Sequence, residues 1–134
     1  MTAKIERVNA LSGEVQKRRE KSAREAAALV LSNVDQFVMT SILRQNGAAY
    51  GVSIREDIEE RTKRSVSFSV IYTALQRLED NGLIESRIGE PTAERGGRRK
   101  THFKITGLGS KVLNASLSDL GAMVRGTKLS EVLS

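Results

Sequence analysis

The sequence contains no cysteine. Disulfides, thiolate metal sites and cysteine nucleophiles are therefore excluded, and nothing indicates an oxidising compartment. No stretch reaches the roughly 18 apolar residues that a membrane-spanning helix needs, and charged residues lie near the N-terminus, where a signal peptide has its apolar core. We therefore expect a soluble, cytoplasmic protein that makes no contact with membranes.

Groups able to catalyse a reaction are also scarce. His102 is the only histidine, and it lies within a predicted strand, where a structural role is more common than a metal ligand or a catalytic base. The sequence has no nucleophile motif and no glycine-rich phosphate loop. We therefore expect neither an enzyme nor a bound cofactor or metal, because no convergent set of titratable groups is apparent.

Positive charge, in contrast, is present in excess. The 134 residues carry a formal net charge of +6, which predicts attraction to nucleic acid because each lysine or arginine that neutralises a phosphate releases a counterion. The same excess also occurs on ordinary solvated surfaces, so the position of the charge matters more than its total. A chain of this length has room for one compact domain and an extended arm.

Residues 1–28 are predicted to form a charged arm. The cluster Lys17-Arg18-Arg19-Glu20-Lys21 and the alanines at 26–28 favour helix, so we expect a helix from about Glu14. Two roles remain open for this arm: a solvated extension that frays, or a segment that contacts DNA.

Helical spacing then predicts two helices. The first should end near Asn46-Gly47, where Gly47 can adopt the left-handed conformation of a helix C-terminus. Its apolar face is predicted to contain Leu31, Val34, Val38, Ile42 and Leu43. The second should begin at Ser53-Ile-Arg-Glu56, which has the capping-box pattern, and should bury Ile54 and Ile58.

A third, stronger helix is predicted from Phe68 to Asn81. Ser67 can cap its start and Gly82 can close its end. The spacing predicts a buried face of Ile71, Ala74, Leu75 and Leu78. The opposite face then carries Ser69, Tyr72, Thr73, Gln76 and Asp80.

The remainder of the chain predicts a hairpin and one last helix. Leu83 to Ile88 and His102 to Thr106 are typical of strands, and the connection between them is long, rich in glycine and basic residues, and expected to be mobile. Thr106 can cap the last helix. An apolar stripe along that helix contains Leu108, Val112, Leu113, Leu117, Leu120 and Val124.

This order of elements predicts an α+β, mostly helical fold: a winged helix-turn-helix with a three-helix core, a hairpin wing, an N-terminal helical arm and a C-terminal helix for dimerisation. The predicted boundaries are 1–28 for the arm, 29–106 for the DNA-binding domain and 107–134 for the dimerisation helix and tail. The third helix fits the major groove of duplex DNA. Basic residues before it and in the wing would contact phosphates or the minor groove. The predicted DNA-binding residues are Lys63, Arg64, Ser67, Ser69, Tyr72, Thr73, Gln76, Arg77, Arg95, Arg98, Arg99 and Lys100.

Three segments together resemble the PadR family of transcription regulators: Tyr50-Gly51, the run Ser67 to Glu85 around Tyr72, and the run Gly97 to Thr106. The resemblance covers about residues 32 to 124. It implies a winged-helix dimer, joined largely by the C-terminal helix, that represses a nearby promoter and often releases DNA when a small molecule binds. The single C-terminal helix resembles the subgroup without a larger C-terminal domain.

The chain departs from the family's usual pattern in several places. Phe68 and Thr73 stand where the family commonly has prolines, and the aromatic pair of the wing's second strand is reduced to His102-Phe103. The long charged N-terminal arm is not part of the usual short form.

Alternative interpretations stay open for several residues. Arg77 could form a salt bridge to a neighbouring carboxylate instead of contacting DNA, and Tyr72 could be a core aromatic, although its position on the helix favours DNA contact. The stripe of the last helix could complete the monomer core instead of forming a dimer. The whole domain could also be a protein-interaction module, since a fold alone does not fix a function.

Overall fold

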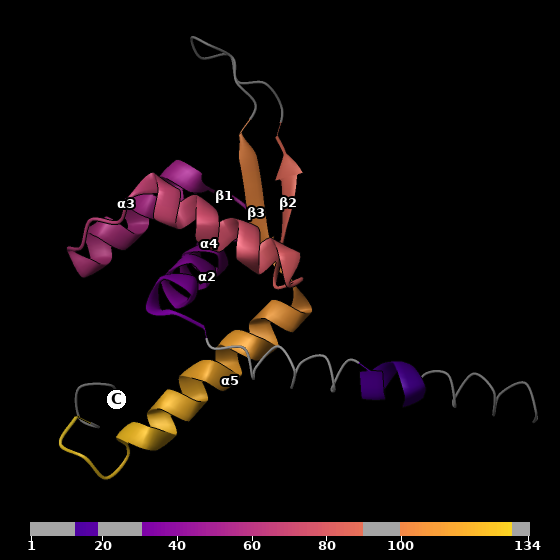
Figure 1. The fold of residues 1–134 in the computed structure, drawn as a ribbon, viewed down its shortest axis with the longest axis vertical. Coiled ribbons are helices and arrows are strands. Elements are labelled where there is room, and N and C mark those ends of the chain that lie inside the picture. The colour runs from indigo at the N-terminus through magenta and orange to yellow at the C-terminus, as the bar shows by residue number, and fades with distance from the viewer. Residues whose placement is uncertain (1–12, 19–30, 90–99, 130–134) are drawn as a thin grey trace, which may run out of the picture.

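The computed structural model describes residues 13–18, 31–89 and 100–129. Residues 13–18 are helical. The elements that follow are α2 (Asn33–Gln45), β1 (Ala49–Tyr50), α3 (Gly51–Thr62), α4 (Phe68–Asp80), β2 (Ile84–Ile88), β3 (Thr101–Ile105) and α5 (Gly107–Val124). In Figure 1, α2, α3 and α4 pack around the sheet, the β2–β3 hairpin points away from the helices, and α5 extends in the opposite direction. The predicted α+β winged-helix fold is confirmed.

Helix α2 begins with a reciprocal cap that the sequence analysis did not identify. The Ser32 hydroxyl accepts a hydrogen bond from the Asp35 N–H (3.1 Å), and the Asp35 carboxylate accepts one from the Ser32 N–H (3.0 Å). The helix is closed at Asn46-Gly47, as predicted: Asn46 is the C-cap with a left-handed φ of 47°, and Gly47 also has a positive φ of 92°. The predicted burial of Leu43 was wrong, because the buried face is centred on Val38, Met39 and Ile42, and Leu43 lies about a quarter turn away.

Helix α3 begins earlier than predicted. Ser53 is not the cap but the third helical residue, where its hydroxyl accepts a hydrogen bond from the Tyr50 N–H (2.9 Å). The chain enters α3 directly from β1, so the register of the predicted capping box was wrong. The predicted burial of Ile54 and Ile58 is confirmed.

The sheet has the order β1-β3-β2, with both pairs antiparallel. The predicted hairpin is confirmed, and Ser86 of β2 lies opposite Phe103 of β3. Strand β1 was not predicted, because two residues are too few to show an alternating pattern.

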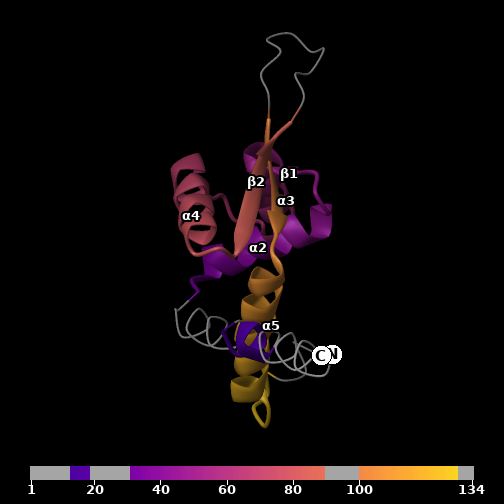
Figure 2. The ribbon, with the colours of Figure 1, turned by 90° about the vertical axis from the view of Figure 1, so that its right-hand side faces the viewer.

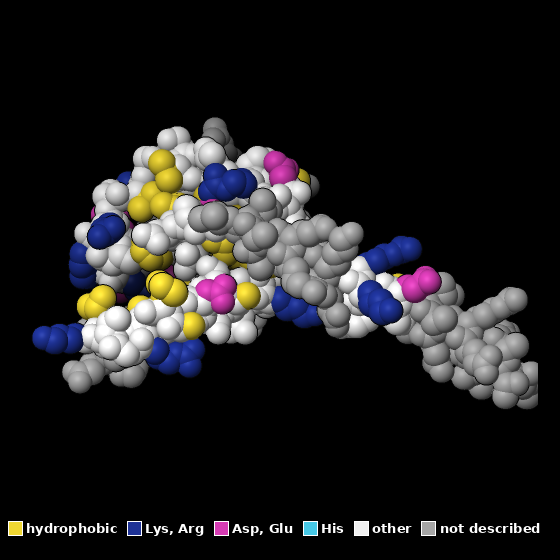
Figure 3. Space-filling view, turned by 60° about the horizontal axis from the view of Figure 1, so that its bottom comes forward, with side chains coloured by type: hydrophobic (Ala, Val, Ile, Leu, Met, Phe, Trp, Pro, Cys, Tyr) yellow, Lys and Arg dark blue, Asp and Glu magenta, His cyan; other side chains and the backbone are white. Residues whose placement is uncertain are grey.

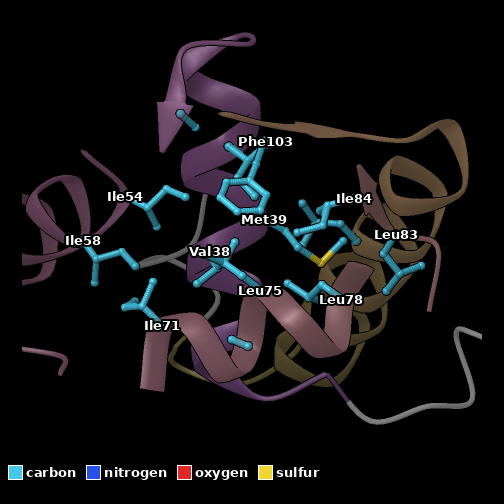
Figure 4. Close-up of a cluster of buried hydrophobic side chains, with 14 of the residues drawn as sticks. Val38, Met39, Ile54, Ile58, Ile71, Leu75, Leu78, Leu83, Ile84 and Phe103 are labelled. Carbon is cyan, nitrogen blue, oxygen red and sulfur yellow. The ribbon is translucent and has the colours of Figure 1, made fainter. Parts of the chain in front are cut away.

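One hydrophobic core joins the helices to the sheet (Figure 4). Side chains from α2, α3, α4, β2 and β3 point toward one another there, and the first turns of α5 add Val112 and Leu113. These two residues complete the core of the chain itself, which is the alternative left open for the last helix. The predicted dimerisation stripe is therefore divided, since its buried members have no surface to offer a partner.

The N-terminus of α5 is fixed to the turn that follows α4. The Thr106 hydroxyl donates to the Gly82 carbonyl oxygen (2.7 Å) and accepts a hydrogen bond from the Gly109 N–H (3.0 Å), which confirms the predicted cap. The approach is so close that a Cβ added at Gly109 would lie 1.9 Å from the Leu83 carbonyl oxygen. Glycine is therefore required at residue 109 by the packing of α5.

Asp57 ties α2 to α3. The Ser41 hydroxyl donates to one Asp57 carboxylate oxygen (2.8 Å), the Arg61 Nε donates to the other (3.1 Å), and Arg44 lies within 3.6 Å. Burial acts to raise the pKa of Asp57, but the Ser41 hydrogen bond and the two arginines outweigh it and hold the pKa below the usual 3.8. The carboxylate thus stays charged where the two helices meet.

Within the described part of the chain, none of the helices combines the length and apolar character needed to cross a membrane.

Candidate nucleic-acid interface

Helix α4 presents one long side to solvent. The Ser67 hydroxyl caps its start by accepting from the Val70 N–H (3.3 Å), and Gly82 follows its end with a φ of 73°. Figure 2 shows α4 at the edge of the molecule, on one side of the β2–β3 hairpin. As predicted, the buried side consists of Ile71, Ala74, Leu75 and Leu78. We call the opposite side, which contains Ser69, Tyr72, Thr73, Gln76 and Asp80, the outward face; all five residues are exposed.

Tyr72 does not lie in the core. Its side chain is 52% exposed and stacks on Phe68, one helical turn earlier, with ring centroids 6.2 Å apart. Its hydroxyl lies so close to the start of α3 that a Cβ at Gly51 would be 2.5 Å from the oxygen. The glycine at residue 51 therefore makes room for the tyrosine at the junction of α3 and α4.

Arg55 completes this junction and was missed by the sequence analysis. Its guanidinium lies 4.5 Å from the centre of the Phe68 ring, and its Nε donates to the Val66 carbonyl oxygen (2.8 Å). Arg55 lies 13 residues before Phe68, so helical spacing gave no signal for this contact. The arginine and the two aromatic rings of Phe68 and Tyr72 hold the start of α4 against α3, and we call them the aromatic cluster.

Arg77 forms the salt bridge that was considered as its alternative role. Its guanidinium donates to the Asp35 carboxylate, which is buried at the start of α2 and also belongs to the cap of that helix. About half of the Arg77 side chain remains exposed. Arg77 thus anchors α4 to α2 at the flank of the outward face, and Asp35 was not identified from the sequence because it lies 42 residues away.

Gln76 and Asp80 also contact each other. The Gln76 Nε2 donates to an Asp80 carboxylate oxygen (2.9 Å), one helical turn further along the outward face. The amide therefore has an intramolecular partner within the outward face, and Thr73, one turn before Gln76, is exposed.

Basic side chains lie in the turn before α4 and at the base of the wing. Lys63 ends α3 in a left-handed conformation (φ 57°), and it and Arg64 are exposed in the turn before α4. At the base of the wing, the Lys100 Nζ lies 4.4 Å from the centre of the Tyr50 ring, and that ring meets the edge of His102. The predicted DNA-binding residues Arg95, Arg98 and Arg99 lie outside the described residues.

The later turns of α5 differ from its first turns. Two members of the predicted stripe, Leu108 in the first turn and Val124 in the last, are half-buried. Between them, Leu117 and Leu120 of the stripe are exposed, and Met123 beside them is 78% exposed. We call residues 117–124 the outer half of α5. Figure 3 views the molecule from this end and shows hydrophobic side chains on the surface of α5. The outer half therefore presents aliphatic surface that the core does not cover.

Among the residues that the structure describes, no three His, Asp or Glu side chains come close enough to hold a metal ion. His102 packs within the wing, against the backbone of Gly89. A Cβ added at that glycine would lie 2.9 Å from the histidine ring. The site is thus a surface of exposed hydroxyl, amide and basic groups on a packed scaffold.

Comparison with known proteins identifies the family to which this chain belongs. The model of the transcriptional regulator PadR-like family matches residues 39–115, which is more than half of the chain. No curated protein matches the chain. A transcriptional regulator from Clostridium thermocellum is 27% identical, with a TM-score of 0.58, over 70% of this chain and 91% of that one.

Two PadR family regulators of known structure have the same fold at lower identity. The protein from Clostridium difficile R20291 is 22% identical, with a TM-score of 0.58, over 77% of this chain and 100% of that one. The protein from Eggerthella lenta is 17% identical, with a TM-score of 0.55, over 97% of both chains. This chain therefore belongs to the PadR-like family of transcriptional regulators.

Proposed function

We propose that this protein is a repressor that binds a palindromic DNA operator as a homodimer. The observation that carries the proposal is the outward face of α4, where Ser69, Tyr72, Thr73 and Gln76 are exposed along one side of a helix fixed at both ends. A helix of this width fits the major groove, where each base pair presents a distinct pattern of donors and acceptors.

The basic residues around α4 would supply affinity without base specificity. Lys63 and Arg64 lie in the turn before the helix, and Lys100 lies at the base of the wing. With Arg95, Arg98 and Arg99 they form the proposed phosphate-contacting set, to which Ser67 adds a hydroxyl at the start of α4. Such contacts position a protein on the duplex and weaken as salt is added. We place Arg77 at the margin of this set, because its ion pair with Asp35 leaves only part of the guanidinium free.

A homodimer would use the outer half of α5. Exposed Leu117, Leu120 and Met123 form a patch whose burial against a second copy would be favourable. A two-fold dimer can place two α4 helices in half-sites one DNA turn apart. In this arrangement the winged helix, residues 29–106, contacts DNA and the segment after Gly107 joins the protomers. The first turns of that segment also belong to the core of each chain.

An effector would bind where the two protomers meet. Small molecules favour concave apolar surfaces with a few polar groups, and the exposed Leu117, Leu120 and Met123 of each protomer would supply apolar surface at such a contact. A molecule that binds there and changes the spacing of the two α4 helices would release the DNA, since the half-site separation is fixed.

The direct test is selection of bound sequences from a random duplex pool by the full-length protein at physiological salt. The proposal predicts enrichment of a palindrome with half-sites about one turn apart. Binding of the enriched duplex should exceed binding of random duplex by about 10³-fold or more. Equal affinity for enriched and random duplex would overturn the proposal and favour a winged helix used for protein interaction.

A further inference from the structure

The first two turns of α4 carry exposed apolar side chains and no charged residue of their own. We propose that this part of the helix recognises thymine through its 5-methyl group, with Val70 and Phe68 as the contacting side chains. This inference rests on the proposed function and adds to it the chemistry by which the bases are distinguished.

Val70 and Phe68 border the outward face on opposite sides. Val70 is 44% exposed and Phe68 is 38% exposed, although both are apolar and both lie within the first turn of α4. Ser69 lies between them, and helical geometry places Thr73 one turn further along the same strip. The first turns of the helix therefore carry a narrow strip of hydroxyl groups, with the methyl groups of Val70 on one side of it and the aromatic ring of Phe68 on the other.

The apolar surface continues beyond Val70 toward α2. A shallow depression between the two helices is lined by Val34, Val70 and Thr73, by Ser32 and Ser69, and by the Asp35–Arg77 ion pair. Val34 is partly buried against the core, so its position is fixed by packing. On the Val34 and Val70 side, a methyl group that projects from the floor of the major groove would meet carbon atoms, and the charged groups of the depression are paired with each other.

Recognition of guanine has no suitable donor on this helix. The commonest specific contact to guanine is a bidentate bond from arginine or lysine to O6 and N7. The only basic residue within Phe68–Asp80 is Arg77, and its guanidinium is bound to the buried Asp35 carboxylate. The only side-chain amide of α4, that of Gln76, lies about two turns after Phe68, where its exposed hydrogen bond to Asp80 can be exchanged for one to a base further along the groove. Hydroxyl and apolar contacts are what remain at the start of the helix.

Both apolar side chains are held in place before DNA arrives. The Phe68 ring contacts both the Arg55 guanidinium, 4.5 Å from the ring centre, and the Tyr72 ring, with centroids 6.2 Å apart. Val70 is β-branched, so its side chain has essentially one rotamer in a helix. Little conformational entropy is then lost on binding, which allows a small apolar contact to contribute to affinity.

The experiment removes the methyl group from the DNA. Each thymine of the duplex selected by the full-length protein is replaced in turn by deoxyuridine, which keeps every base-pairing group. At one or more thymines in each half-site, the loss of a buried methyl should weaken binding by about fourfold. Replacement outside the half-sites should leave affinity unchanged.

Variants assign the methyl groups to side chains. In Val70→Ala the thymine and deoxyuridine duplexes should bind equally well at the position that Val70 contacts, and Phe68→Ala should do the same at a different position. Leu43→Ala removes another exposed apolar side chain, far along α2 from this surface, and should retain the full difference. Thermal unfolding of each variant verifies that the fold is kept.

Two outcomes would overturn the inference, and they are distinguishable. Specific binding that is insensitive to deoxyuridine at every thymine, or half-sites fixed only at G·C pairs, would contradict thymine recognition while leaving the proposed function intact. Binding without any sequence preference would contradict the proposed function, and the inference with it.

Discussion

The outward face of α4 and the outer half of α5 are both exposed, yet they differ in chemistry and in how they are held. The α4 face carries hydroxyl and amide groups, and its neighbours fix it through the aromatic cluster and the Arg77–Asp35 pair. The outer half of α5 carries Leu117, Leu120 and Met123 and contacts little of the core. A rigid polar face suits a polar ligand that must be distinguished from similar ones, whereas an uncovered aliphatic face suits an apolar partner.

The two halves of α5 should differ most in their response to an added methyl group. In Gly109→Ala the new Cβ would meet the Leu83 carbonyl oxygen, so the winged helix should lose about 3 kcal/mol of unfolding free energy. In Gly121→Ala the new Cβ meets nothing within 4 Å, and the better helix former should add about 0.5–1 kcal/mol. Urea unfolding of both variants measures the difference. Similar midpoints would mean that the first turns of α5 are not part of the core.

A charge placed on the outer half of α5 should break the dimer without unfolding the chain. Leu120→Lys puts a lysine into both copies of the interface, and we expect the dimer dissociation constant to rise on the order of 100-fold. Sedimentation or light scattering over a range of concentrations measures this change. Ser118→Lys, a polar and exposed neighbour on the same helix, is the matched control. A dimer that is unaffected by Leu120→Lys would contradict the assigned role of this surface.

The Arg77–Asp35 pair tests whether the flank of α4 belongs to the scaffold or to the DNA-contacting surface. Arg77→Met keeps the length of the side chain but leaves the buried Asp35 carboxylate without its partner, which should cost about 2 kcal/mol of stability. If Arg77 belongs to the scaffold, the ratio of specific to random DNA affinity should be unchanged at a temperature where the variant is folded. A variant of normal stability that discriminates poorly would instead place Arg77 among the base-contacting residues.

The smallest expected effect is the pH dependence from Asp57, which lies between α2 and α3, away from the proposed contacts of both surfaces. Its pKa is lower in the folded chain than the usual 3.8, so its contribution to stability is fully present above that value and is lost as the pH falls through the folded pKa. The unfolding free energy of the wild type should therefore fall more steeply below about pH 4 than that of Asp57→Asn. Parallel curves would mean that the Ser41 and arginine contacts do not favour the charged carboxylate.

Periodic elements could be predicted from the sequence because each encodes its own buried face. The four buried residues of α4 and its caps at Ser67 and Gly82 follow from helical spacing and turn chemistry. The division of α5 could not be predicted in this way. Its stripe is continuous in sequence, and only the position of Val112 and Leu113 against the core distinguishes the buried turns from the exposed ones.

Contacts between residues far apart in the sequence are the part of the candidate site that could not be predicted. The outward residues of α4 follow from its period, but the groups that hold it do not. Arg55 reaches Phe68 from another helix, and Asp35 reaches Arg77 across 42 positions. Strand β1 forms only because β3 is present to pair with it. Such features depend on the assembled fold, which a local pattern does not contain.

The central claim is that the outward face of α4 distinguishes bases while the basic groups around it supply general affinity. Its most direct test is a titration of the selected and a scrambled duplex with wild type, Gln76→Ala and Arg98→Ala. The account predicts that Gln76→Ala reduces the ratio of the two affinities about tenfold, whereas Arg98→Ala weakens binding of both duplexes equally. An unchanged ratio in Gln76→Ala, together with a reduced ratio in Arg98→Ala, would contradict the account.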